Sequence, residues 1–377
     1  MSARVLCVLL VGGCGFHSTA SAVAGDAAPP ADAAPDSAPS ETPGDASFCL
    51  GNAVVTVCLT QAPMGPLTIG QPKAIDTDNS ADCSRDAVGS SAAYCILAGN
   101  SITIMGAQLL SAHGSRPLVL MSSGAITVAG TIDVAGHMMG MPQPTGPGVP
   151  PSTGASSPCT PATAATNGGG GAGGSFGSTG GHGGAEGGGD GTGGVPAAQI
   201  APTTLRGGCS GEAGPGGGAA GGGGGAVALL AATMIQIDGV INASGGGGRG
   251  SMNIINRGGG GGGAGGMIVI DAPKVSGGAP ARIFANGGSG GEGSGGFKGL
   301  DGHDAPMDPH MAAAGGSGGS SAGDGGDGAD DKAQGSHGAG DGGNGSSAGG
   351  GGGGGGIGVI KLYQAGSLPG TVSPPTN

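Results

Sequence analysis

Apolar and polar residues alternate in two stretches of the chain that share one pattern. Residues 118–136 read LVLMSSGAITVAGTIDVAG, and residues 227–245 read VALLAATMIQIDGVINASG. Strict alternation is typical of β-strands that have one buried face. The shared skeleton, I-x-I/V-x-G-x-I-x-V/A-x-G, falls on Ile126, Val128, Gly130, Ile132, Val134 and Gly136, and on Ile235, Ile237, Gly239, Ile241, Ala243 and Gly245. The pattern therefore predicts a repeated structural unit, or rung, of about 20 residues.

Three further stretches carry parts of the same pattern: 94–114, 267–287 and the terminal strand 357–363. We predict an all-β fold, a short β-solenoid (β-helix-like) stack of rungs whose apolar positions face a common interior. The alternative is an antiparallel β-sandwich or meander, in which Asp238-Gly239 forms a two-residue hairpin turn. The stack explains better why the rungs keep one register across insertions of very different length.

If the rungs stack, residues at the same position of successive rungs should align. Thr103, Thr127 and Gln236 are predicted to align on an outward face, and Asp133 is predicted beside Asn242. Polar ladders of this kind are structural more often than functional.

Glycine-rich blocks interrupt the rungs at 137–225, 246–266 and 288–356. If the rungs stack, all three blocks leave from one corner. They then either pack side by side as extended polyglycine strands, because glycine has no Cβ, or they stay disordered, as the chain entropy of glycine favours. The aspartate-rich part at 323–341 is expected to be loose.

These patterns divide the chain along its length. The predicted segments are a signal peptide (1–13), an Ala/Pro/Asp-rich tether (14–47), a cysteine-bearing cap with short strands (48–93), rungs (94–136), a glycine-rich insertion (137–225), a rung (226–245), a glycine-rich loop (246–266), a rung (267–287), a Gly/Asp-rich insertion (288–356), a terminal strand (357–365) and a tail (366–377).

Composition narrows the class of protein. Of 377 residues, 98 are Gly and 26 are Pro, without the strict period of collagen, which indicates low complexity over much of the chain. The formal net charge of −12 argues against a nucleic-acid partner and against binding to anionic lipid through a basic patch. The acidic charge is consistent with a soluble glycine-rich surface.

The first residues indicate export. MSARVLCVLLVGG (1–13) has a short basic start and an apolar run too short to span a bilayer, which is typical of a signal peptide. Val11-Gly12-Gly13-Cys14 resembles a bacterial lipobox, and the resemblance implies lipidation at Cys14. Gly15 follows instead of Asp, which in diderm bacteria implies the outer membrane. The alternative is plain secretion, with cleavage after Ala22 or Ala24.

Cysteine usage agrees with export. Cys7 lies in the signal segment and Cys14 is the lipidation candidate, which leaves six cysteines, an even number that favours disulfides in an exported chain. Proximity in the sequence suggests the pairs Cys49–Cys58, Cys83–Cys95 and Cys159–Cys209. The sequence contains no CxxC motif and no His/Cys cluster, so it does not predict a zinc site.

Candidate metal and catalytic residues are sparse. Residues 325–333, GGDGADDKA, match the glycines of a calcium-binding nonapeptide, with Asp327 and Asp330 as weak calcium candidates, but Lys332 stands at its apolar position. Asp76, Asp78 and Asp82 lack EF-hand spacing, and the histidines of HMMGM (137–141) and of 303–310 form no ligand set. We expect no cofactor.

A polysaccharide-cleaving β-helix needs paired carboxylates and usually aromatic sugar platforms. The rungs offer as acids and bases only Asp133, Asp238, Asp271, Lys274 and Arg282, and the chain has no Trp. We therefore expect no enzyme.

The chain resembles glycine-rich exported bacterial lipoproteins, in which I-x-V-x-G-x-I-x-A-x-G strands alternate with polyglycine. The matching residues are Ile126–Gly136, Ile235–Gly245 and Val11–Cys14. By composition the chain is PE-PGRS-like, but it has no PE-type helical N-terminus, so no function of that family is implied. We predict a non-catalytic cell-surface lipoprotein with a structural or adhesive role, whose partners are the membrane and surface glycans or other envelope proteins. The alternative is a polysaccharide-binding or polysaccharide-cleaving β-helix.

Overall fold

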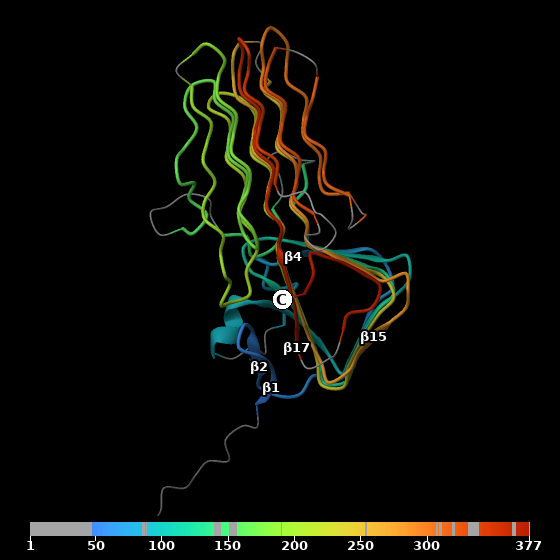
Figure 1. Ribbon diagram of the computed structural model, residues 1–377. Coiled ribbons are helices and arrows are strands. Elements are labelled where there is room, and N and C mark those ends of the chain that lie inside the picture. Colours follow the sequence, from blue (N-terminus) through green and yellow to red (C-terminus); the bar gives the residue numbers. More distant parts are fainter. Residues whose placement is uncertain are drawn as a thin grey trace, which may run out of the picture. The chain divides into compact units, whose positions relative to one another are not determined.

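The computed structural model describes residues 47–84, 87, 89–138, 145–150, 157–189, 191–252, 255–306, 308, 311–318, 321–330, 339–363 and 367–376. The chain divides into two units, residues 1–44 and 45–377, and the described residues all belong to the second unit. They form β-strands, one short 3-10 helix, η1 (Gly89–Ala93), and no α-helix (Figure 1). The predicted all-β class is confirmed for this part of the chain.

Most strands belong to three parallel sheets of five, six and five strands. Sheet 1 contains, in spatial order, β15 (Val275–Gly277), β12 (Met234–Ile237), β9 (Ala125–Val128), β6 (Ser101–Ile104) and β3 (Pro66–Ile69). Sheet 2 contains β18 (Thr371–Ser373), β16 (Arg282–Phe284), β13 (Val240–Asn242), β10 (Thr131–Asp133), β7 (Leu109–His113) and β4 (Lys73–Asp76). Sheet 3 contains β17 (Val359–Tyr363), β14 (Met267–Asp271), β11 (Ala226–Ala231), β8 (Leu118–Ser122) and β5 (Cys95–Gly99).

From β3 to β17 the chain visits sheets 1, 2 and 3 in the same order on every circuit, and β18 then lies in sheet 2 with no further strand of sheet 1 among the described residues. From the second circuit on, each strand pairs in parallel with the strand one circuit earlier. The two rungs lie in register throughout, with Ile126 opposite Ile235 and Ile132 opposite Ile241. The predicted ladder is also present, because Thr127 lies between Thr103 and Gln236 on sheet 1.

Three details of the prediction are corrected. The sheets are parallel, so the antiparallel alternative is wrong, and Asp238-Gly239 connects β12 of sheet 1 to β13 of sheet 2 instead of closing a hairpin. The first circuit begins at β3 and β4, inside the segment assigned to the cap. The assigned tail contains β18, which pairs with β16. Strands of three or four residues carry too little alternation to be recognised alone.

Inward-facing side chains form one core between the three sheets. Stacks such as Ile102, Ile126 and Ile235 are almost fully buried. A second apolar cluster covers the outer face of sheet 3, where Val57 of the hairpin β1 (Phe48–Gly51) and β2 (Thr56–Leu59) packs with Phe176 from a glycine-rich block. Sheet 3 is therefore covered on both faces, which explains its continuous apolar strands.

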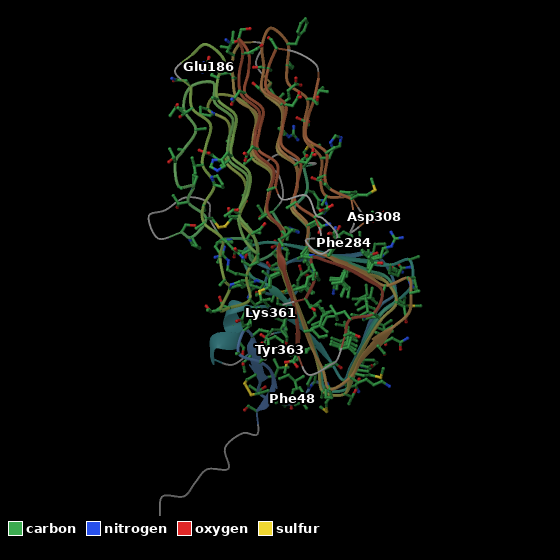
Figure 2. All side chains as sticks on the ribbon, viewed as in Figure 1. Phe48, Glu186, Phe284, Asp308, Lys361 and Tyr363 are labelled. Carbon is green, nitrogen blue, oxygen red and sulfur yellow. A yellow bond between two sulfur atoms is a disulfide. The ribbon has the colours of Figure 1, made fainter. Side chains whose placement is uncertain are left out.

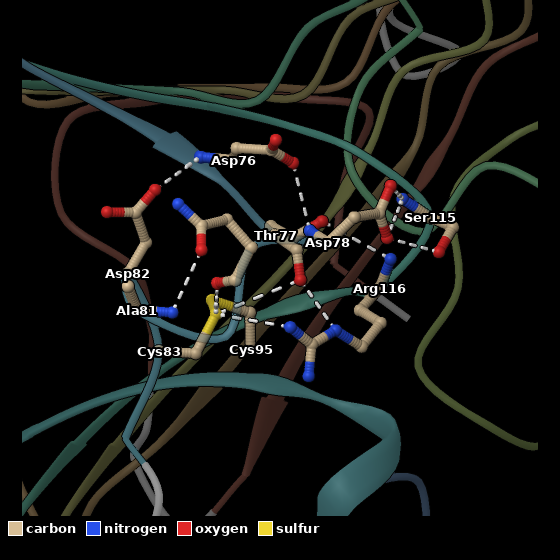
Figure 3. The surroundings of a disulfide bond; sticks show 10 residues. Asp76, Thr77, Asp78, Ala81, Asp82, Cys83, Cys95, Ser115 and Arg116 are labelled. Carbon is tan, nitrogen blue, oxygen red and sulfur yellow. Dashed lines mark hydrogen bonds between the residues drawn. A yellow bond between two sulfur atoms is a disulfide. The ribbon is translucent and has the colours of Figure 1, made fainter.

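The three predicted cysteine pairs lie at disulfide distance. Their sulfur–sulfur separations are 2.06 Å for Cys49–Cys58, 2.02 Å for Cys83–Cys95 and 2.03 Å for Cys159–Cys209. Figure 3 shows the surroundings of the Cys83–Cys95 bond.

Asp76 at the end of β4 and the two aspartates of the loop that follows it accept hydrogen bonds from their own surroundings (Figure 3). Asp76 accepts from the N–H of Asp78, and Asp82 accepts from the N–H of Asp76. Asp78 accepts from Ser115, whose hydroxyl lowers the pKa of that carboxyl. These carboxylates thus organise the loop.

All three glycine-rich blocks leave from one corner, as the stack predicts. Each connects a strand of sheet 2 to the following strand of sheet 3: β10 to β11, β13 to β14 and β16 to β17. Figure 1 shows these connections running side by side away from the strands.

Candidate functional site: the glycine bundle and its end surface

The glycine-rich blocks pack into an array of extended segments, which we call the glycine bundle, formed by the described residues of 168–225, 243–266, 285–330 and 339–358. Its organisation is clearest around segment 258–266. The backbone N–H groups of this segment donate in rotation to three different neighbours: Gly259 to Gly350 (3.0 Å), Gly260 to Arg249 (2.9 Å), Gly261 to Glu212 (2.8 Å), and Gly262 to Gly353 (2.9 Å) as the rotation repeats. Three residues per turn is the period of a polyproline II helix.

The carbonyl groups of the same segment accept from three other neighbours. Gly171 donates to Gly259 (2.9 Å), Gly291 donates to Gly260 (2.9 Å) and Gly221 donates to Gly261 (2.8 Å). Segment 258–266 is therefore surrounded by six extended segments. Segment 349–356 has the same arrangement, with bonds to 168–174, 181–187, 258–266, 285–293, 323–329 and 340–343.

At most positions only glycine permits this packing, although Ala264 of segment 258–266 is accommodated in the second apolar cluster. A methyl group on Gly261 would lie 2.0 Å from the carbonyl oxygen of Ala172, and one on Gly353 would lie 2.2 Å from that of Gly181. Both contacts are with backbone, which cannot rotate away. Of the two alternatives for the glycine blocks, the described residues show the packed one. The segment expected to be loose is also bonded where it is described, because Gly343 donates to Asp324 and Gly340 donates to Asp327; residues 331–338 lie outside the described residues.

A histidine ties the base of the glycine bundle to sheet 2. Nε2 of His137 lies 3.3 Å from a carboxylate oxygen of Asp133 on β10, and its Nδ1 lies 3.6 Å from one of Asp304. The hydrogen bond to Asp133, followed by the bond to Asp304, raises the pKa of His137 to about 10. Asp304 also accepts from the N–H groups of Met138 and Gly247, each at 2.8 Å. The imidazole thus joins the segment after β10 to the loop that carries Asp304, and Asp304 in turn bonds the segment that carries Gly247.

At the opposite end of the bundle, two turns carry large apolar side chains into solvent. Segment 243–250 leaves β13 and would extend about 25 Å at ~3.1 Å per residue before it turns. The exposed fractions are 58% for Met252, 58% for Ile255, 75% for Phe297 and 52% for Leu300. We call these four residues the end surface. They account for half of the eight exposed large apolar side chains among the described residues.

The two turns are joined by hydrogen bonds, so the end surface is one feature. The Ser294 hydroxyl donates to the carbonyl oxygen of Ile255 (2.6 Å) and lies 3.1 Å from the Ser251 hydroxyl, and Gly299 N–H donates to Ser251 (3.0 Å). Figure 2 labels Glu186, from another segment, at this end of the bundle.

Charges of both signs flank the end surface, since the exposed Asp301 follows Leu300 and Glu292 accepts from the N–H of Leu300 (2.9 Å). Lys298 is exposed beside Phe297, and the half-buried Arg257 closes the neighbouring turn. A contiguous exposed apolar patch is uncommon on soluble proteins and usually marks an interaction site. Apolar side chains flanked by charges of both signs suit a partner surface that combines apolar groups with polar ones.

Most residues proposed from the sequence do not gather. Cys14 lies outside the described residues. Asp133 lies on sheet 2 and Asp271, which is buried, lies on sheet 3 and accepts from Asn52 (3.0 Å). Asp238 lies at the corner after β12 and accepts from Gln236 and Gly278.

The structure likewise separates the remaining candidates. Lys274 immediately precedes β15, and Arg282 is the first residue of β16. Asp327 accepts from the N–H of Gly315 (2.8 Å), and Asp330 is buried. Within the described ranges, no three His, Cys, Asp or Glu side chains gather as a metal ion requires.

Sequence reasoning missed the end surface and the Asp133–His137–Asp304 contact. A signal for the first existed, because Met252, Ile255, Phe297 and Leu300 are large apolar residues isolated within Gly- and Ser-rich stretches. For the second, only the spacing of Asp133 and His137 was visible, since Asp304 comes from a distant loop.

Searches of protein-family models, curated proteins and solved structures found no match to the chain. In the part of the chain that the structure describes, no helix is long and apolar enough to cross a membrane.

Proposed function

We propose that this protein is a non-catalytic cell-surface lipoprotein that acts in adhesion, with the glycine bundle as a stiff support and the end surface as its contact region. Lipidation at Cys14 would attach the chain to the outer membrane, and the Ala/Pro-rich tether would separate the folded unit from the lipid. The partners expected are surface glycans or other envelope proteins.

We also propose that the three sheets constitute a β-solenoid. Supporting observations are the fixed order in which the chain visits the sheets and the in-register parallel pairing along each of them. Spin labels at positions 103, 127 and 236 test the stack: neighbours along a ladder lie about 4.8 Å apart, so labels at 127 and 236 should couple strongly and those at 103 and 236 more weakly. Equal coupling for the two pairs contradicts the solenoid.

The observation that carries the adhesive role is the exposure of Phe297, with Met252 and Ile255 beside it, at the end of a hydrogen-bonded support. Leaving a large apolar side chain in water gains nothing for folding, whereas burying it against a partner contributes about 2 kcal/mol, or roughly 30-fold in affinity. Rigid presentation also reduces the entropy lost on binding.

Adhesion can be measured with beads that carry the full-length chain, retained on intact bacterial cells. The double variant Met252→Ser/Phe297→Ser should lower apparent affinity by at least about 30-fold. The matched control is Met64→Ser, because Met64 is 85% exposed and precedes β3, outside the bundle. Equal retention of the double variant and the wild type would remove the end surface from the proposal.

The anchor is tested separately, by mass spectrometry of the mature N-terminus. We expect a lipid-modified Cys14, and release of the Cys14→Ser variant from membranes. An unmodified terminus at Val23 or Gly25 would show secretion without an anchor.

A further inference from the structure

A cavity of about 480 Å³ lies beside segment 168–177 of the glycine bundle. Its walls come from Ala172 and Ser175 of that segment, from Ala197, and from Glu212 and Ala213 of a neighbouring segment. The loop that begins at the disulfide-bonded Cys159 forms the remaining wall. The walls are mostly methyl groups and backbone.

The cavity occupies a definite place in the hydrogen-bonded array. Segment 168–177 is bonded to five extended neighbours: 180–187, 192–195, 208–213, 258–266 and 349–356. Segments 258–266 and 349–356 each have six neighbouring segments, so the array accommodates six neighbours around one segment. The sixth side of segment 168–177, between 192–197 and 208–213, is the side that faces the cavity.

The hydrogen bonds donated by the N–H groups of segment 168–177 identify the same side as the one that faces no extended neighbour. Gly170 and Gly173 donate to 180–187, and Gly171 and Gly174 donate to 258–266. Ala172, in the third position of the rotation, donates to the carboxylate of Glu212 (3.1 Å) instead of to a backbone carbonyl. On this side the hydrogen-bond acceptor is therefore a side-chain carboxylate, whereas on the other sides it is a backbone carbonyl of an extended segment.

We propose that this cavity binds an extended peptide of glycine and alanine in the polyproline II conformation, which lies against segment 168–177 as its sixth neighbour. A ~3.1 Å rise and a ~4.8 Å separation between chains give about 60 Å³ per residue, so the cavity holds several residues. A peptide packed at that separation leaves room beside its backbone for no more than a methyl group, so glycine and alanine fit and larger side chains do not. Each carboxylate oxygen of Glu212 already accepts one N–H, from Ala165 (2.9 Å) and from Ala172 (3.1 Å), and has a second lone pair for an N–H group of the peptide.

The test uses the mature full-length protein and isothermal titration calorimetry with the peptide acetyl-(Gly-Gly-Ala)3-amide. We expect saturable binding, and no binding of acetyl-(Gly-Gly-Leu)3-amide, whose side chains meet the alanine walls. Ala213→Phe fills the cavity and should weaken binding at least tenfold. The matched control is Ala198→Phe, because Ala198 is exposed and does not line the cavity.

Three results would overturn the assignment: no binding of the Gly/Ala peptide at millimolar concentration, equal binding to Ala213→Phe and wild type, or equal binding of the leucine peptide. Binding of butylammonium in place of the peptide would show a cation site at Glu212 and would also reject it. If Ala213→Phe lowers the unfolding temperature, Ala164→Phe on the opposite wall replaces it.

Discussion

The stacked sheets and the glycine bundle are built from the same chain but are held together differently. In the sheets, side chains such as Ile126 and Ile235 fill an interior, and burial of apolar surface stabilises the stack. In the bundle, segments such as 258–266 have almost no side chains, and cohesion comes from backbone hydrogen bonds to six neighbours. Each such bond contributes only about 1 kcal/mol net, so the bundle depends on making nearly all of them.

This difference predicts opposite sensitivities to mutation. The sheets should tolerate changes of side-chain shape and be damaged by loss of volume. The bundle has no side-chain volume to lose, and should be damaged by any addition. The sequence pattern of each region reflects this, with alternating Ile and Val in one and uninterrupted Gly in the other.

The largest effect is expected for the addition of one methyl group inside the bundle. Gly261→Ala places Cβ 2.0 Å from the carbonyl oxygen of Ala172 and should cost more than about 4 kcal/mol, or disrupt the bundle alone. Hydrogen exchange of the bundle and thermal unfolding measure the effect. The same substitution at Gly106, where nothing lies within 4 Å of the added Cβ, is the control and should be neutral or slightly stabilising. Equal stability of the two variants would mean that the six-neighbour array is not present in solution.

The next effect concerns the disulfides. Cys159–Cys209 closes a separation of 50 residues and ties Cys159 to a segment of the bundle, and the double alanine variant should lose about 4 kcal/mol of stability. Cys49–Cys58 closes a separation of 9 in the hairpin and should contribute less, about 2.5 kcal/mol. Denaturant unfolding of the two double variants compares them. The reverse ranking would show that the bundle retains its chain path without the bond.

A core truncation tests the sheets. Ile235→Ala removes volume from a fully buried position between Ile126 and Val275 and should cost about 3 kcal/mol, with the loss seen first in the sheets. Gln236→Ala, on the outward face of the same strand, should change little. If the bundle unfolds before the sheets in Ile235→Ala, the two regions are not independently stabilised.

The smallest effect lies where the two regions meet. The pKa of His137 is raised to about 10 in the folded protein, above its ordinary value of 6.5, so the contribution of the charged ring is complete below pH 6.5 and is lost as pH rises toward 10. Because the side chain is 42% exposed, solvent screening reduces this contribution to about 1 kcal/mol. Unfolding free energies of wild type and His137→Gln should therefore converge between pH 6.5 and 10. Parallel curves for wild type and His137→Gln across this range would refute the interpretation.

The sequence predicts the sheets better than the bundle for a physical reason. Alternation at Ile126–Val128 and Ile235–Ile237 specifies which face is buried, so register follows once the rungs are stacked. Every residue of a run such as 349–356 is identical, so nothing in the sequence distinguishes the three directions in which its N–H groups point. Packed and disordered glycine could not be told apart, because the deciding term is a set of long-range backbone bonds.

The candidate site depends on the same long-range information. Phe297 and Ile255 are separated in sequence and come together only because their turns close adjacent segments of the bundle. The contact between His137 and Asp304 has the same origin. In contrast, the cysteine pairs could be predicted from the sequence, since each partner is the next available cysteine along the chain.

The threefold periodicity of the bonds has a consequence for how the protein can vary in length. A segment that gains or loses one or two residues would rotate its N–H groups away from every neighbour at once, whereas whole triplets preserve all of them. To lengthen the bundle, every segment must gain three residues at once. The length of the bundle can therefore change only in steps of one three-residue turn. The turns that cap the segments obey no such constraint, and a foreign peptide inserted at residues 295–298 should leave the lattice beneath it intact.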